Sequence, residues 1–219
     1  MSETNQVDSN SMLPADKQER RSIYESMKFD HGVGGGQLFP KSFTELLALA
    51  KLMAMSDVAV PPHLRGNEGA CFAVAMQAVR WGFDPFAVSQ KTYLVVSQKN
   101  PEPKLAYEAQ LIAAVVNTRA NLAKRPENSY SGQGNNLICT VTYTFQNGDV
   151  RIYDSPEFRS ISPKNSPLWQ TDPKSQLVYY SLRAAARRWV PEVILGIYDR
   201  DEIEGAEPMR DINPRNGGQ

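Results

Sequence analysis

Apolar residues recur at the helical period in two stretches that follow the polar start of the chain. The first runs over 43–54 behind Ser42, a residue type that caps helices, and it ends before a Pro-Pro pair. The second runs from about Asn67 to Trp81 and meets Gly82, a residue type that ends helices. The pattern therefore predicts two consecutive amphipathic helices.

Alternating apolar positions around turn residues predict two β-hairpins. The first would pair residues 91–96 with 104–107 across an Asn-Pro-Glu-Pro turn. The second would pair 137–145 with 150–153, and its Asn147-Gly148 turn is a strong short-range signal for a hairpin.

Two more helices are predicted in the second half of the chain. One covers Glu108 to Asn121 and is followed by a polar loop that reaches Asn136. The other begins near Pro173, behind Thr171 or Asp172 as a cap, and continues to about Trp189. The whole pattern predicts an α+β fold, in which two β-hairpins form a small antiparallel sheet packed with helices.

The low apolar content at both ends predicts one domain with tails. Residues 1–40 are polar and then glycine-rich, which predicts a flexible arm with one short helix over 16–29. Residues 41–203 would form the domain, and residues 204–219 would form an acidic disordered tail.

Composition excludes several classes of protein. With 41% hydrophobic and 22% charged residues, the chain resembles an ordinary globular protein, and its apolar runs are too short to span a membrane. The start of the chain lacks the pattern of a signal peptide, so the expected location is the cytoplasm. Cys71 and Cys139 lie outside any paired spacing and are expected to be neither a disulfide nor metal ligands.

The net charge of zero conceals an uneven distribution. Residues 1–79 carry 7 basic and 9 acidic side chains, residues 80–188 carry 14 and 8, and residues 189–219 carry 3 and 7. A basic centre favours a polyanionic partner, because cations that neutralise phosphates release counterions. A distribution without functional consequence is the alternative.

The predicted helix after Pro173 carries the densest chemistry. At 100° per residue, Val178, Leu182, Ala185 and Trp189 share one face, whereas Gln176, Tyr180, Arg183 and Arg187 share the opposite face. Between Phe158 and Trp189 there are six basic residues and one acid, so most of these cations lack a partner within the segment. Arginines beside tyrosines suit single strands, which need cations for phosphates and flat partners for bases. The other interpretation is a solvated face with ion pairs to other elements.

The first hairpin offers a second candidate surface. Lys91, Tyr93 and Val95 would share one face of its first strand, which gives a basic and aromatic edge. A half-buried strand with a solvated lysine would have the same pattern.

Enzymatic interpretations have less support. Asp84 with Glu102 and Lys104 is similar to the carboxylate and lysine arrangement of Mg²⁺-dependent nucleases, but the prolines beside Glu102 place it in a predicted turn. His31 and His63 lack partners at metal spacing. The glycines of 32–36 are not followed by the Lys-Ser/Thr of a phosphate-binding loop, so no ATP site is expected.

Four stretches together resemble the RecT family of phage annealing recombinases. They are Ala75–Pro85 running into Gln90–Tyr93, Leu105–Leu111, Ser166–Leu177 and Arg187–Gly196. The resemblance covers roughly 43–203. It implies a core similar to the Rad52 and lambda Red-beta annealing proteins, in which a hairpin sheet and a long helix form a groove for DNA.

The resemblance also implies a function. We expect an ATP-independent protein without covalent catalysis that binds single-stranded DNA, anneals it to a complementary strand and serves recombination and repair of phage or prophage DNA. Its partners would be copies of itself in a ring or helical filament, a 5′-to-3′ exonuclease and a host single-strand binding protein. No cofactor is expected to be required, although Mg²⁺ could assist annealing.

The two surfaces and the resemblance together predict the DNA-binding residues. They are Gln90, Lys91, Tyr93, Lys104, Tyr107, Gln110, Arg159, Lys164, Trp169, Lys174, Gln176, Tyr180, Arg183, Arg187 and Arg188. Substitution of Arg183 or Arg187 by alanine is expected to weaken binding to all sequences. The alternatives are a single-strand or architectural DNA-binding protein that does not anneal, a Mg²⁺-dependent nuclease, and a phage structural protein.

Overall fold

The computed structural model describes residues 40–97, 100–162, 164 and 166–205, together with 17, 18 and 22. The predicted helix over 16–29, the glycine-rich segment with His31, Lys99 and the tail after residue 205 therefore lie outside the described residues, apart from those three positions. The chain divides into two compact units, Met1–Gln90 and Lys91–Gln219, and each is considered by itself.

The N-terminal unit consists of helices whose ends are set by capping residues. The elements are α2 (Phe43–Ala54), η1 (Pro62–Leu64), α3 (Glu68–Trp81) and α4 (Pro85–Ser89). The Ser42 hydroxyl accepts a hydrogen bond from the Glu45 backbone N–H at 3.1 Å, and Gly82 ends α3 at a φ of 65°. Both predicted helices are confirmed, and the short helix α4 follows α3 with Asp84 as its N-cap.

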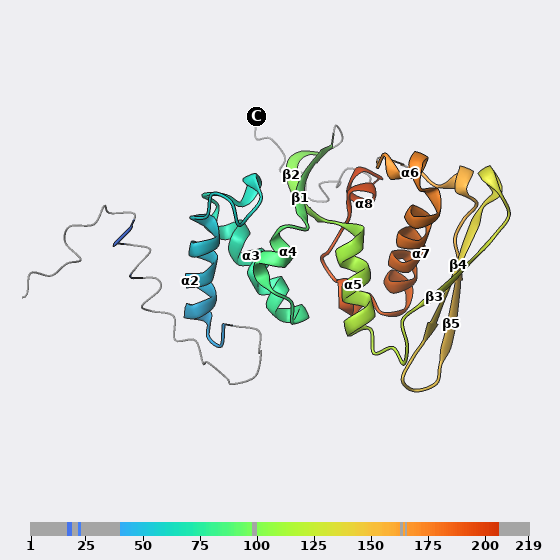
Figure 1. Cartoon of the computed structure of the whole chain (residues 1–219), viewed down its shortest axis with the longest axis horizontal. Coiled ribbons are helices and arrows are strands. Elements are labelled where there is room, and N and C mark those ends of the chain that lie inside the picture. The colour runs from blue at the N-terminus through green and yellow to red at the C-terminus, as the bar shows by residue number, and fades with distance from the viewer. Residues whose placement is uncertain are drawn as a thin grey trace, which may run out of the picture. The chain divides into compact units, whose positions relative to one another are not determined.

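The larger part of the C-terminal unit has three layers (Figure 1). One layer is an antiparallel sheet in the order β3-β4-β5, formed by β3 (Glu127–Ser131), β4 (Ile138–Thr144) and β5 (Val150–Asp154). The long helix α7 (Pro173–Trp189) packs on β4, and α5 (Ala109–Arg119) packs on α7. Tyr143 of β4 is buried and its hydroxyl donates to the Leu182 carbonyl at 2.7 Å, which fixes the sheet to α7.

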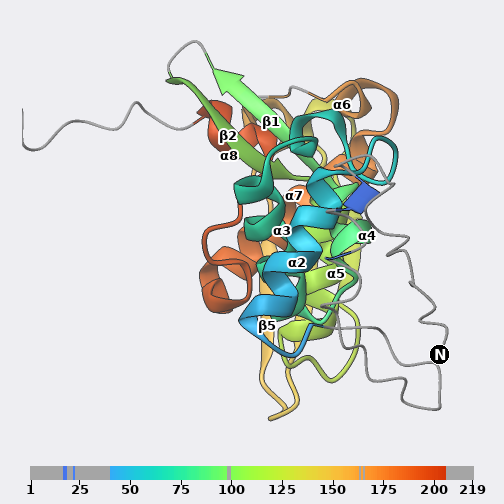
Figure 2. The same ribbon diagram turned by 90° about the vertical axis from the view of Figure 1, so that its left-hand side faces the viewer.

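A separate two-stranded sheet completes this unit. Strands β1 (Thr92–Ser97) and β2 (Asn100–Tyr107) pair antiparallel, with Leu94 opposite Leu105. The short helix α8 (Arg200–Gly205) lies beside this hairpin, and Ile203 forms a small core with Val95 and Ala106 (Figure 2).

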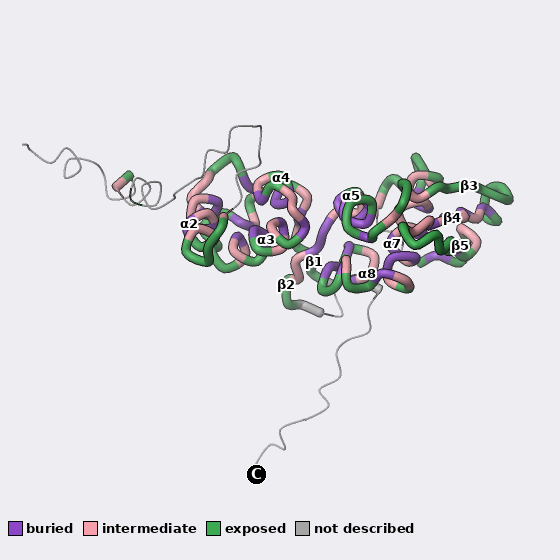
Figure 3. The backbone as a smooth tube through the Cα atoms, turned by 90° about the horizontal axis from the view of Figure 1, so that it is seen from below, coloured by how far each residue is buried: buried purple, intermediate pink, exposed green. Residues whose placement is uncertain are grey.

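The predicted α+β class and both hairpins are confirmed, but the hairpins belong to two different sheets. Strand β3 is the described strand that the sequence pattern missed, since this segment was expected to be loop. All of its residues are exposed (Figure 3), so the alternation that identifies a half-buried strand is missing. Short connecting elements are η2 (Gly134–Asn136), η3 (Phe158–Ser160), α6 (Leu168–Thr171) and η4 (Pro191–Ile194).

Candidate nucleic-acid interface

A pocket of about 810 Å³ lies where the β3–β4 connection meets η3, α6 and the first turn of α7. Among the described residues that line it are two lysines, three aromatic rings and several amides, and none of them is a carboxylate. The lining consists of Tyr130, Gly132, Gln133, Gly134, Asn135, Leu137, Phe158, Lys164, Trp169, Gln170, Pro173 and Lys174. We call it the lysine pocket.

The wall formed by the β3–β4 connection depends on a glycine. Gly132 has a φ of +72°, and a Cβ at this position would lie 2.1 Å from the carbonyl oxygen of Asn136. No residue with a side chain fits there without a shift of the backbone. The Tyr130 hydroxyl donates to the Lys174 carbonyl at 3.0 Å, so β3 is fixed directly to the start of α7.

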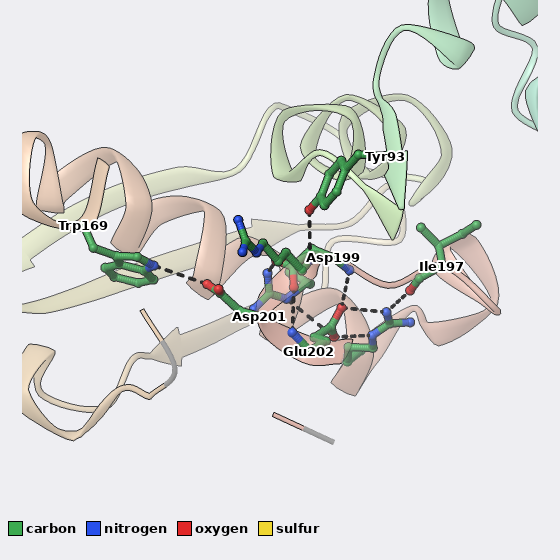
Figure 4. A network of polar contacts seen from close by, with 9 residues as sticks. Tyr93, Trp169, Ile197, Asp199, Asp201 and Glu202 are labelled. Carbon is green, nitrogen blue, oxygen red and sulfur yellow. Dashed lines mark hydrogen bonds and ion pairs between the residues drawn. The ribbon is translucent and has the colours of Figure 1, made fainter. Parts of the chain in front are cut away.

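Trp169 also lines the pocket. Its side chain is 3% exposed, and its indole Nε1 donates to the Asp201 carboxylate at 3.2 Å (Figure 4). The Phe158 ring lies 5.9 Å from it, between centroids. Because its indole N–H is bound by Asp201 and its ring is buried, Trp169 is a fixed part of the pocket lining.

Both lysines lie over aromatic rings instead of carboxylates. The Nζ of Lys164 is 4.1 Å from the centroid of Phe158, and the Nζ of Lys174 is 5.3 Å from that of Tyr130. Neither ammonium has a carboxylate within ion-pair distance in the part of the chain that the structure describes. A cation–π contact orients an ammonium without neutralising it, so both charges remain available to an anion.

Two of the predicted DNA-binding arginines have a different environment. Arg183 is 7% exposed and pairs with Asp199, while Arg187 pairs with Glu202 at 3.0 Å and donates to the carbonyls of Ile194 and Ile197. Burial lowers the pKa of the Arg183 guanidinium, and the nearby Glu202 carboxylate opposes this shift. The Arg183 guanidinium is therefore buried, and that of Arg187 is partly buried and paired, so this face of the helix does not present two free cations.

The carboxylates that neutralise these arginines also start α8. The Glu202 N–H donates to the Asp199 carboxylate at 2.9 Å, and the Asp199 N–H donates to Glu202 at 3.1 Å, which is a reciprocal capping box (Figure 4). This cluster, formed by Arg183, Arg187, Asp199 and Glu202, is named the buried ion cluster. The cluster agrees with the alternative interpretation of this helix, a face that forms ion pairs with other elements. Its acids lie at positions 199 and 202, after the basic segment 158–189.

The remaining predicted residues of α7 are divided among several places. Gln176 lines a smaller pocket of about 510 Å³ together with Tyr93 and Gln110, beside three carboxylates. Tyr180 lies against the Arg183 guanidinium at 5.7 Å. Arg188 is exposed at the far end of the helix.

The predicted residues of the first hairpin are largely engaged within the protein. Tyr107 is 5% exposed, and burial raises the pKa of its hydroxyl to about 12. The Tyr93 hydroxyl accepts from the Arg200 N–H at 2.9 Å, and Lys91 pairs with Glu108 at 2.9 Å. Lys104 is half-buried opposite Val95. The basic and aromatic edge of this hairpin therefore faces its own unit in part.

Two further predicted residues, and the two carboxylates of the nuclease interpretation, lie outside the lysine pocket. Arg159 pairs with Glu157 at 2.7 Å on the surface, and Gln90 belongs to the N-terminal unit, where its amide donates to the Ala59 carbonyl. Glu102 lies within β2 and not in a turn, because both strands of a two-stranded sheet are edges and tolerate proline. The Asp84 carboxylate caps α4 in the other unit.

The lysine pocket thus gathers Lys164, Trp169 and Lys174 from the predicted set and adds residues that were missed. Tyr130, Gln133, Phe158 and Gln170 were not predicted, since β3 was taken as loop and the other three lie in loops or short elements. The one available signal was the isolated Tyr130 in an otherwise polar segment.

Surfaces that bind single-stranded nucleic acid combine cationic side chains with aromatic rings, and the lysine pocket contains both. Comparison with known proteins agrees with this class. The RecT family model matches residues 48–133 and 121–214, and the chain belongs to the RecT family. Membership of this family implies oligomerisation, binding of single-stranded DNA and single-strand annealing in recombination.

No curated protein and no solved structure matches the chain. Within the described residues, no helix is both long and apolar enough to cross a bilayer. The same part of the chain holds no cluster of three or more histidine, cysteine, aspartate or glutamate side chains arranged to bind a metal ion.

Proposed function

We propose that this protein anneals complementary DNA strands without ATP and without covalent catalysis, and that the lysine pocket holds the backbone and bases of a bound strand. The observation that carries the proposal is the pair of unneutralised ammonium groups beside three aromatic rings in one pocket. Phosphates bind cationic side chains, and unpaired bases stack on aromatic rings.

The pocket would act by alignment. Lys164 and Lys174 would contact phosphates. A bound strand would draw the two ammonium groups away from the rings beneath them, and the rings of Phe158 and Tyr130 would then contact its bases. Bases that keep one edge open can pair with a second strand, and pairing with stacking supplies on the order of 1.4 kcal/mol per step. The protein then contributes orientation and charge neutralisation, so no covalent step is needed.

The setting proposed for this activity is recombination of phage or prophage DNA. Copies of the chain would form a ring or helical filament, a companion 5′-to-3′ exonuclease would supply single strands, and a host single-strand binding protein would hand them over. Mg²⁺ would assist by screening the two strands, and no cofactor would be required.

An annealing assay tests the proposal. Two complementary oligonucleotides, one carrying a fluorophore and one a quencher, are mixed with the protein in the absence of any nucleoside triphosphate. We expect faster pairing than in buffer. The K164Q/K174Q variant should lose most of the acceleration, whereas Lys51→Gln, which removes a lysine from α2 in the other unit, should retain it.

The same assay separates the second candidate function, a protein that coats single strands without annealing them. Such a protein would use the same cations and rings, but it would slow pairing. Binding without acceleration would therefore overturn the annealing proposal and leave the pocket as a coating site.

A further inference from the structure

A second hollow lies at the opposite end of α7 from the lysine pocket. It has a volume of about 390 Å³ and is formed by the β4–β5 turn and the last turn of α7. Its described lining consists of Phe145, Asn147, Asp149, Arg151, Arg188 and Trp189. At about 1.5 Å of rise per residue, Lys174 and Arg188 are roughly 21 Å apart along the helix.

The charges of this hollow are available to a ligand. Arg188 is exposed and has no carboxylate within ion-pair distance in the described part of the chain, whereas its neighbour Arg187 is engaged by Glu202. Arg151 lies 3.6 Å from Asp149, and both side chains are more than half exposed. An exposed pair at this distance holds an arginine weakly.

The hollow also has a rigid aromatic side. The Trp189 ring is fixed by edge contacts with Tyr143 at 5.5 Å and Tyr153 at 6.4 Å, between centroids. The facing turn is fixed as well, since Gly148 has a φ of +86° and its N–H donates to the Phe145 carbonyl at 3.0 Å. Two guanidinium groups and a fixed indole line this hollow, as two ammonium groups and aromatic rings line the lysine pocket, although this hollow also contains the Asp149 carboxylate.

A simpler role for Arg188 would be to stabilise the C-terminal end of α7 through the helix dipole. Arg80 provides a control for that role, because it is an exposed arginine in the last turn of α3 and lines neither of the two hollows. The helix dipole explains Arg188 alone. It does not explain why Arg151, from a different element, lines the same hollow.

We propose that Arg151, Arg188 and Trp189 form a second site for the phosphate backbone of a DNA strand. This inference rests on the proposed function. The occupant is either the continuation of the strand held in the lysine pocket or the complementary strand. A span of roughly 21 Å corresponds to about six phosphates at the B-DNA spacing of about 3.4 Å, so a strand of about 4 nucleotides that is held at this spacing does not reach both sites.

The test compares R151Q/R188Q with R80Q and with K164Q/K174Q. Affinity is measured for single-stranded oligonucleotides of about 4 and about 20 nucleotides over a series of salt concentrations, and annealing rates are measured in parallel.

If one strand spans both sites, R151Q/R188Q should lower the salt slope by about 1.4 for the long oligonucleotide only. If the second site holds the complement, R151Q/R188Q should bind single strands normally and slow annealing several-fold. R151K/R188K should restore most of either loss, and thermal denaturation checks that all variants fold.

Two results would count against the second site. If R151Q/R188Q matches R80Q in binding and in annealing while K164Q/K174Q is impaired, the second site is excluded and the proposed function stands. If K164Q/K174Q is unimpaired as well, the role proposed for the lysine pocket fails together with this inference.

Discussion

The buried ion cluster and the lysine pocket both contain cations that the sequence presents as one basic segment, yet their neighbours differ. In the cluster, Arg183 and Arg187 are held by Asp199 and Glu202. In the pocket, Lys164 and Lys174 lie over Phe158 and Tyr130 and have no carboxylate partner among the described residues. The partner, and not the number of charges, decides whether a cation supports the fold or remains available to a phosphate.

The difference also assigns the two regions different tasks. The cluster joins the middle of α7 to the start of α8, and α8 in turn packs on the β1–β2 hairpin. Loss of a cluster residue should therefore lower stability, whereas loss of a pocket residue should lower DNA affinity.

The largest effect is expected for Arg183→Ala. Removal of the guanidinium leaves the Asp199 carboxylate, which is also buried, without its cation, and such a change costs about 3–5 kcal/mol of the free energy of unfolding. Urea denaturation measures this loss. A smaller loss is expected for the double variant R183M/D199N, which removes both charges and keeps a side-chain oxygen that can cap α8.

The affinity of Arg183→Ala for single-stranded DNA should not change, in contrast to its stability. At a temperature where Arg183→Ala is folded, its affinity for single-stranded DNA should equal that of the unmodified protein. Normal stability with weakened binding would instead show that Arg183 contacts DNA, as the sequence pattern predicts.

The next effect is a loss of stability at alkaline pH. Burial raises the pKa of Tyr107 to about 12 from an ordinary value of 10.0. Below pH 10 the hydroxyl is protonated in both states. As the pH rises from 10 to 12, the unfolded chain loses this proton while the folded chain keeps it, so the free energy of unfolding falls by up to roughly 3 kcal/mol.

Tyr107→Phe should reduce this alkaline loss in denaturant titrations carried out at several pH values. An identical pH profile in the variant would show that Tyr107 is not the buried group that titrates. An alkaline loss that remains in part is expected, because burial also raises the pKa of Tyr143 and Tyr153.

A smaller effect, on the order of 2 kcal/mol, is expected for Gly132→Ala. The substitution adds a Cβ that meets the Asn136 carbonyl oxygen and disfavours the positive φ of this residue. Gly134→Ala is the matched control, since Gly134 also has a positive φ but its added Cβ would meet nothing within 4 Å. We expect Gly132→Ala to lose more stability and to bind single-stranded DNA more weakly than Gly134→Ala; equal losses would show that the close approach at Gly132 is unimportant.

Local signals in the sequence predicted most of the fold. Capping residues such as Ser42, stop residues such as Gly82 and the Asn147-Gly148 turn act over a few positions, and each was found where predicted. Strand β3 was missed because an exposed edge strand has no apolar alternation, and its pairing with β4 is not a local property.

The candidate site was predicted less completely for a similar reason. Lys164, Trp169 and Lys174 were identified, but the rings beneath the lysines come from β3 and η3, which are distant from them in sequence. The acids that bury Arg183 and Arg187 lie at 199 and 202, outside the helix that carries these arginines. Charge counts within one segment cannot identify partners from another.

The smallest effect is expected on the stability of K164Q/K174Q. Each substitution removes one cation–π contact at the surface, worth about 0.5–1 kcal/mol at an exposed site, and leaves no buried charge behind. Urea denaturation should show a loss of about 1–2 kcal/mol at most. A loss as large as that of Arg183→Ala would remove the contrast between pocket and cluster.

The salt dependence of single-strand binding in K164Q/K174Q tests the central claim most directly. Each phosphate contact contributes about 0.7 to the slope of log affinity against log salt for single strands, so the double variant should lose about 1.4 in slope. At a salt concentration of about 0.15 M this corresponds to an affinity lower by on the order of 10-fold. An unchanged slope and affinity would show that the lysine pocket does not hold the DNA backbone.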